Sequence, residues 1–260
     1  MKNWFPLNLR ISLLCLLLPR VASEGAAATS STHELLKQGD VFDLRLHPRE
    51  ALECYLPAEK LDPENVSLLL RIARQYRHQM ADAAVLTEKI RLSAMGLSYA
   101  QRAVMLAPKD SDAHLSVAIS YAKSLELYGN KEKMKALREV KCCADQAIAL
   151  NPTNDVAWYI LGRWHERVAD LGVLKRKVAE LAYGSLPPAT NDDAVRCFTR
   201  AIRLNPERSV YYVDLGITCA AMANKADAKK FIEKGLALPN QGKDDPDTKN
   251  RGREILRSLQ

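Results

Sequence analysis

One spacing of small and large side chains occurs four times in this chain and constrains its fold more than any other feature. Three positions are separated by four and then three residues, and a proline follows five residues later. The four copies are Ala51/Tyr55/Ala58/Pro63, Gly96/Ala100/Ala103/Pro108, Val140/Ala144/Ala147/Pro152 and Ala194/Phe198/Ala201/Pro206. Steps of three and four place side chains on one helix face, and the proline stops the helix. The spacing therefore predicts four similar helices, each ending shortly before a proline.

A second type of helix is predicted after each of these prolines. It carries a large apolar residue, a small residue and an aromatic residue or its substitute, in that order. The examples are Leu69/Ala73/Tyr76, Val117/Ala118/Tyr121, Trp158/Gly162/His165 and Tyr212/Gly216/Cys219, and Leu35/Gly39/Phe42 fits the same frame upstream. Small residues allow two helices to cross closely. The combined pattern resembles the tetratricopeptide (TPR) repeat.

The repeats define the expected architecture, an all-α, TPR-like right-handed α-α superhelix of about five irregular helix pairs plus a C-terminal capping helix. We expect a leader at residues 1–23 and one repeat domain at 24–260. The approximate units are 32–63, 64–108, 109–152, 153–206 and 207–240, followed by a cap at 245–260. The fifth unit has the weakest pattern.

Three of the units carry extra residues between their two helices. The segments 80–95 and 124–139 are rich in Leu, Ala and Lys, which predicts extended helices or short extra turns. The third segment, 166–185, is expected to continue the preceding helix as far as Gly184. Either Thr190 or Asn191 is expected to cap the next helix.

The first residues are typical of a targeting segment. Lys2 and Arg10 give a basic start, Ile11 to Leu18 is an apolar run, and Val21-Ala22-Ser23 offers small residues for cleavage. The apolar run is shorter than the roughly 20 residues that span a bilayer. We therefore expect a cleaved secretory signal and an exported protein, periplasmic or secreted. A mitochondrial presequence is the main alternative, and an uncleaved leader would permit membrane association.

Charge and cysteine content exclude several classes of function. The net charge is +7, and the leader holds three cations and no acid, so the remainder carries only about four excess charges. No nucleic-acid partner is expected. The six cysteines form no zinc-ligand spacing, so no metal is expected. The thiols are interpreted as buried small apolar residues on helices, although one disulfide remains open.

The segment Trp164-His165-Glu166-Arg167 invites comparison with the zinc-protease motif. That motif needs a second histidine four residues after the first, and position 169 is alanine. We therefore interpret His165 as a core or groove residue. Glycine-rich phosphate loops and nucleophile elbows are also absent from the sequence. No enzyme activity, cofactor or small-molecule substrate is expected.

The concave face of such a superhelix is its usual binding surface. The repeat frame places a candidate peptide groove on the first helices of the units, and arginines there could hold a carboxylate in a bidentate manner. The alternative is that these arginines form a solvated face or pair with Glu166, Asp170 and Glu180. The candidate groove residues are Arg74, Arg77, His78, Leu115, Ile119, Lys123, Tyr159, Arg163, Arg167 and Val213.

One region is more specific than a general TPR pattern. It runs from Leu161-Gly162-Arg163-Trp164 through Val168-Ala169-Asp170-Leu171 and Arg176-Lys177-Val178-Ala179 to Gly184-Ser185, Pro187-Pro188-Ala189-Thr190 and Asp193-Ala194-Val195. This run resembles the regulator of microtubule dynamics family over about residues 65–240, best in 155–210. The resemblance implies association with microtubules or with mitochondrial or endoplasmic-reticulum membranes, or an exported prokaryotic relative.

Two functions follow as hypotheses. The first is a non-enzymatic scaffold that binds a peptide or helical segment of a protein partner in the concave groove. The alternative is a membrane- or microtubule-associated adaptor, which the family resemblance implies.

Overall fold

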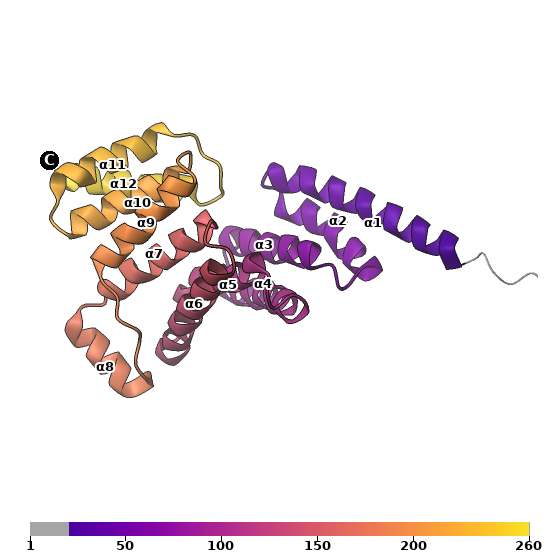
Figure 1. Cartoon of the computed structure of the whole chain (residues 1–260), viewed down its shortest axis with the longest axis horizontal. Coiled ribbons are helices and arrows are strands. Elements are labelled where there is room, and N and C mark those ends of the chain that lie inside the picture. Colours follow the sequence, from indigo (N-terminus) through magenta and orange to yellow (C-terminus); the bar gives the residue numbers. More distant parts are fainter. Residues whose placement is uncertain (1–20, 260) are drawn as a thin grey trace, which may run out of the picture.

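The computed structural model describes residues 21–259, and within them the chain forms twelve α-helices, one short 3₁₀ helix and no strand. Figure 1 shows the helices following one another along a curved array. The expected all-α superhelix is confirmed. The elements are α1 (Val21–Leu44), α2 (Pro48–Leu61), α3 (Val66–Asp82), α4 (Leu86–Leu106), α5 (Ser111–Ser124), η1 (Leu125–Leu127), α6 (Asn130–Leu150), α7 (Asp155–Ala169), α8 (Val173–Tyr183), α9 (Asn191–Leu204), α10 (Ser209–Ala221), α11 (Lys225–Ala237) and α12 (Asp245–Ser258).

Five antiparallel helix pairs make up the array. They are α1/α2, α3/α4, α5/α6, α7/α9 and α10/α11. The predicted stop before each proline is confirmed, because α2, α4, α6 and α9 all end two residues before one. The small and aromatic residues of the repeated spacing lie inside, and Tyr55 and Phe198 are fully buried. The periodicity therefore marks the contact face of the second helix in each pair.

Small residues set how closely the paired helices approach. A β-carbon at Gly162 of α7 would lie 2.7 Å from the ring of Phe198 in α9. At Gly216 of α10 it would lie 2.8 Å from the carbonyl oxygen of Ala228 in α11, which is backbone and has little freedom to move. Real β-carbons do not approach other heavy atoms so closely, so glycine is required at both crossings.

The extra segments follow the sequence expectation only in part. Helices α4 and α6 are long, with 21 residues each, and η1 precedes α6. The expectation that 166–185 continues one helix is wrong. Helix α7 ends at Ala169, Gly172 takes φ +70°, and α8 begins as a separate helix at Val173. A positive φ interrupts the helical backbone and glycine adopts it at low cost, so the direction of the chain changes there. Thr190, one of the two expected caps, accepts from the amide of Asp193 and caps α9.

Helix α8 presents an apolar stripe to solvent. Figure 1 shows it standing away from the rest of the array. Leu174, Val178 and Leu181 are 76%, 62% and 92% exposed and share one face at helical spacing. On its inner side Arg176 donates to Glu180 and to the carbonyl oxygens of Leu186 and Pro187. The helix is thus fixed through polar contacts while its apolar stripe is uncovered.

The last helix packs on the final repeat. Helix α12 contacts both α10 and α11, and a β-carbon at its Gly252 would lie 2.8 Å from Val213 of α10. Residues 238–244, here called the C-terminal strap, connect α11 to α12. The strap reaches the first half of the array, because Lys243 pairs with Asp82 at the end of α3.

The predicted leader lies mostly outside the described residues, and Val21-Ala22-Ser23 form the first turn of α1. None of the helices in residues 21–259 has the length and apolar character needed to cross a membrane. The cysteines of this part are free thiols. Cys197 and Cys219 are buried, as expected, whereas Cys142 is exposed, so the interpretation of all of them as buried residues is wrong for that position.

We expect Gly216→Ala to destabilise the fold by about 1–3 kcal/mol, the usual range for overpacking, because the new methyl group meets the backbone of α11. Gly129→Ala is the matched control. Position 129 precedes α6 at an ordinary negative φ, and a β-carbon there would meet only a flexible glutamate at 3.4 Å. Chemical denaturation of both variants measures the difference. Equal stability of the two variants would contradict the close crossing.

Candidate functional site

The concave side of the array holds two neighbouring cavities. The first, of about 460 Å³, lies among α5, α7 and α12 and is lined by Lys123, Tyr159, Arg163 and Arg167. The second, of about 860 Å³, lies between α3 and α5 and is lined by Arg74, Arg77, His78 and Leu115. We call them the C-terminal and the N-terminal cavity. Ile119 lines both, so nine of the ten residues expected in the groove border one cavity or the other.

Val213 is the residue that does not reach either cavity. Its side chain is fully buried. A β-carbon at Gly235 of α11 would lie 2.6 Å from it, and one at Gly252 of α12 would lie 2.8 Å from it. The helical frame placed Val213 on the inner face of α10, and that face is covered by α12. It therefore serves the core of the last repeat.

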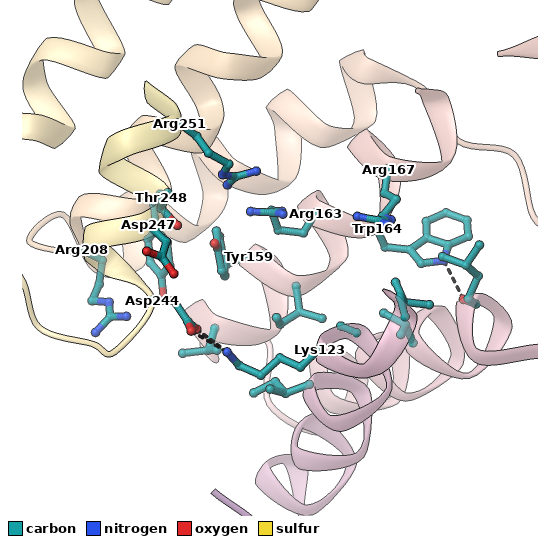
Figure 2. A pocket seen from close by; sticks show the side chains of 18 residues that line it. Lys123, Tyr159, Arg163, Trp164, Arg167, Arg208, Asp244, Asp247, Thr248 and Arg251 are labelled. Carbon is teal, nitrogen blue, oxygen red and sulfur yellow. Dashed lines mark hydrogen bonds and ion pairs between the residues drawn. The ribbon is translucent and has the colours of Figure 1, made fainter. Parts of the chain in front are cut away.

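The C-terminal strap lies between the two cavities. Residues 240–243 line the N-terminal cavity, and Asp244, Asp247 and Thr248 line the C-terminal one. The amino group of Lys123 donates to both carboxylate oxygens of Asp244, at 2.7 and 2.6 Å, and Figure 2 shows this pair at the edge of the C-terminal cavity. The pair with Lys123 holds the pKa of Asp244 below its usual value. A stretch of this chain's own peptide thus already occupies part of the groove.

The strap is anchored at its end by a buried carboxylate. Asp245 is 1% exposed, and it accepts from the hydroxyl of Ser209 at 3.1 Å and from the backbone amide of Gln241 at 2.8 Å. Arg208 lies 3.9 Å from the same carboxylate. A buried carboxylate is tolerated only when hydrogen bonds or cations compensate it, so these contacts fix the turn from the strap into α12.

A second buried carboxylate, Asp214 of α10, joins three helices. It is fully buried and accepts hydrogen bonds from Tyr159 at 2.7 Å, Arg163 at 2.7 Å and Arg251 at 2.6 Å. Figure 2 shows Arg163 of α7 and Arg251 of α12 directed toward the same region. Asp214 is therefore the polar contact between α7, α10 and α12.

Arg163 is further committed to Glu166 on its own helix, at 3.3 Å. Burial, and then repulsion from Asp214, raise the pKa of Glu166 to about 7, while Arg163 and Arg251 oppose this shift. Arg167 pairs with Glu126, which lies in η1. Both arginines thus have acidic partners within the fold. Of the three partners that the alternative named, Glu166 pairs with Arg163, whereas Asp214 and Glu126 come from other elements.

The basic residues of the N-terminal cavity differ in the hydrogen-bond and ion-pair partners that they have. Arg74 pairs with Asp43 at the end of α1. Arg77 is 7% exposed and donates only to the hydroxyls of Ser116 and Ser120 and to a backbone carbonyl. Burial lowers the pKa of the neighbouring His78 to about 4, and Nδ1 of that ring is buried without a hydrogen-bond partner in the described chain.

His165 lies away from the cavities, in the packing between α7 and α9. It is 8% exposed, stacks edge-on against Trp164, and its Nδ1 lies 3.9 Å from Asp193. Burial lowers its pKa. The described residues include no cluster of three or more histidine, cysteine or carboxylate side chains placed to hold a metal ion. His165 is therefore a core residue.

Sequence reasoning missed Asp214, Asp244 and Arg251. The repeat frame treats the inner face of each first helix as solvent-facing, whereas α12 and the strap cover part of it. One signal in the sequence could have indicated this contact. It is the acidic run Asp244-Asp245-Pro246-Asp247 in a chain whose groove was expected to be basic. Opposite charge in a single chain favours contact.

A family model described as regulator of microtubule dynamics protein 1-3 matches residues 35–260. Regulator of microtubule dynamics protein 2 of Rattus norvegicus is 28% identical over 221 residues, which are 82% of this chain and 52% of that protein. Regulator of microtubule dynamics protein 1 of Mus musculus is 26% identical over 236 residues, covering 89% of this chain and 76% of the relative. The chain thus spans about half the length of the rat relative. Neither name concerns export, so export stays a prediction.

Among solved structures, a thermophilic TPR protein of Thermus thermophilus has a TM-score of 0.62 at 16% identity. The match covers 87% of this chain and 99% of that protein. At this identity the likeness concerns the fold, and it places the helix pairs among TPR arrays.

We expect Asp214→Ala to destabilise the fold by about 3–5 kcal/mol, because it removes a fully buried carboxylate that pairs with Arg163 and also accepts from Tyr159 and Arg251. Glu233→Gln is the control, because that carboxylate is more than half exposed and makes only a long ion pair of 4.0 Å with Lys229. Its effect on the free energy of unfolding should stay within about 0.5 kcal/mol. Urea unfolding followed by circular dichroism measures both. A change below about 1 kcal/mol for Asp214→Ala would show that the three contacts are not coupled to folding.

Proposed function

The chain belongs to the regulator of microtubule dynamics protein 1-3 family, and we propose that it is a non-enzymatic scaffold that binds a peptide or helical segment of a protein partner in its concave groove. The observation that carries this proposal is the strap itself. An irregular stretch of polypeptide, residues 240–244, already lies in the groove and is held by side chains of the repeats. This contact between the strap and the repeats supports a role of the surface in holding a peptide.

The composition of the groove supports the same function. Apolar side chains from several repeats, such as Ile119, Val156 and Ile160, line it together with arginines and lysines. Helix-in-groove recognition uses an apolar surface for the buried side of the ligand and polar groups at its margins. Central apolar contacts supply most of the affinity in such interfaces, and rim charges supply orientation.

Selection from a phage-displayed library of random dodecapeptides tests this function, with the full chain as bait. We expect selected peptides to lose about tenfold or more in affinity for Ile119→Gln, since a central apolar contact is worth about 1.4 kcal/mol or more. Met105→Gln is the control, because Met105 is 73% exposed and lines neither cavity. Fluorescence anisotropy measures both affinities. Equal affinity for the two variants would place the peptides elsewhere and overturn the groove function.

A second candidate function is that of a microtubule-associated adaptor. The family relatives are named regulators of microtubule dynamics, and α8 offers an uncovered surface away from the groove. Its stripe of Leu174, Val178 and Leu181 lies between Lys175 and Lys177 on the helix surface. Exposed apolar patches rimmed by polar residues are typical of protein interfaces. We propose that α8 would make this contact.

Cosedimentation with polymerised tubulin tests the adaptor function. We expect the full chain to pellet with microtubules, and the double variant Leu174→Gln/Leu181→Gln to lose most of that binding because its apolar stripe is interrupted. Met105→Gln again serves as the control for an exposed apolar residue outside α8. Absence of pelleting for the unmodified chain, or equal pelleting of all three proteins, would contradict a role for α8 in this function.

A further inference from the structure

Arg77 is the one arginine of the N-terminal cavity that is both buried and without an acidic partner among the described residues. Its Nη1 atom lies 3.0 Å from the hydroxyl oxygens of Ser116 and Ser120, and no carboxylate lies within ion-pair distance among the described side chains of residues 31–259. Its remaining nitrogens make no hydrogen bond there. Burial, and then the nearby charge of Arg74, lower the pKa of Arg77 to about 9, although the more distant carboxylate of Asp244 opposes this shift. The guanidinium therefore lies in a setting that disfavours its own charge.

The other cations of this cavity are neutralised. Three of them have carboxylate partners, and the fourth, Arg208, lies 3.9 Å from Asp245. The three pairs are Arg71–Asp40, Arg74–Asp43 and Lys243–Asp82. Arg77 is the most buried of the five cations that line the cavity, and it is the one for which no ion pair is formed within the described side chains.

A buried cation without a counter-ion is costly to the fold unless something compensates it. Two serine hydroxyls orient the guanidinium but carry no charge. Guanidinium has a planar fork of donors that matches a carboxylate in bidentate geometry. The adjoining cavity of about 860 Å³ has room for such a group on an incoming peptide.

We propose that Arg77 is the receptor for a carboxylate of the bound segment, so that the groove selects an acidic peptide. This inference rests on the proposed scaffold function and names the chemistry of its partner. A pairing of a carboxylate with a cation already occurs at the adjacent cavity, where Asp244 in the acidic run of residues 244–247 binds Lys123. The acidic peptide would extend that arrangement from the strap into the N-terminal cavity.

Fluorescein-labelled hexaglutamate is the probe, with labelled hexaglutamine as its uncharged counterpart. We expect hexaglutamate to bind the full chain more tightly than hexaglutamine. Arg77→Met should weaken hexaglutamate binding at least about 30-fold, because a buried charge pair loses about 2 kcal/mol or more when one partner is removed. Arg77→Lys keeps the charge but not the planar fork of donors. Its affinity for hexaglutamate should lie between those of the unmodified chain and Arg77→Met. Arg200→Met is the matched control, because Arg200 is exposed on α9 and lines neither cavity, and its effect should stay below about fivefold.

Thermal unfolding separates this role from a structural one. Because Arg77 has no acidic partner in the described chain, Arg77→Met should melt within a few degrees of the unmodified protein, whereas a steep fall would identify Arg77 as a structural residue and overturn the proposal. Equal losses of hexaglutamate affinity for Arg77→Met and Arg200→Met would show that binding depends only on the overall positive charge. That result would also overturn the proposal. Displacement of hexaglutamate by inorganic phosphate at lower concentration than by glutarate would identify a phosphate site instead.

The library selection described above distinguishes the two levels of the proposal. If selected dodecapeptides bind the groove but show no enrichment in Asp and Glu, and hexaglutamate fails to bind, the scaffold function stands and the acidic specificity is overturned. If neither selected peptides nor hexaglutamate depend on groove residues, the scaffold function fails as well. Enrichment in acidic residues that is lost on Arg77→Met supports both.

Discussion

The buried carboxylate of Asp214 is the contact on which the arrangement of the concave face depends. It is fully buried in α10 and collects Tyr159 and Arg163 from α7 and Arg251 from α12. A carboxylate without these donors would be costly at that depth, and so would Arg163 without the carboxylate. The last helix is consequently fixed against the inner side of the final repeat. That placement turns the preceding strap across the groove and divides it into two cavities.

This arrangement sorts the basic residues of the groove into two kinds. Arg163 and Arg167 look like ligand-binding residues in the sequence, but acidic side chains of the same chain occupy them. Arg77 is more deeply buried than either, at 7% exposed, and its partners in the described chain are two serine hydroxyls and a backbone carbonyl. Internal ion pairs therefore occupy most of the basic side chains of the groove. Arg77 is the exception.

The repeat pattern was sufficient for the fold because its signals are local. A proline after a fixed number of residues ends a helix wherever it occurs, and the burial of Tyr55 or Phe198 follows from spacing alone. The sequence predicted which residues border the cavities for nine of the ten positions. It did not predict their interaction partners, because several of these are distant in the sequence. Asp214 lies 51 residues from Arg163, and Arg251 belongs to a helix outside the repeats. The break at Gly172 was missed although a glycine just past a helical run is a common signal for a helix end. The positive φ at this residue shows that the helix stops there.

The strap and α12 differ in how firmly they are held. The strap meets the first half of the array through Lys123–Asp244 and Lys243–Asp82, whose carboxylates are more than half exposed. Such pairs contribute about 0–1 kcal/mol each. Helix α12, in contrast, is held by buried carboxylates at Asp214 and Asp245 and by close packing of Gly252 on Val213. The two exposed ion pairs are therefore the weaker contacts of the strap, and α12 is the more firmly held element. Because the family match extends through residue 260, the strap and the groove that it crosses lie within the matched region.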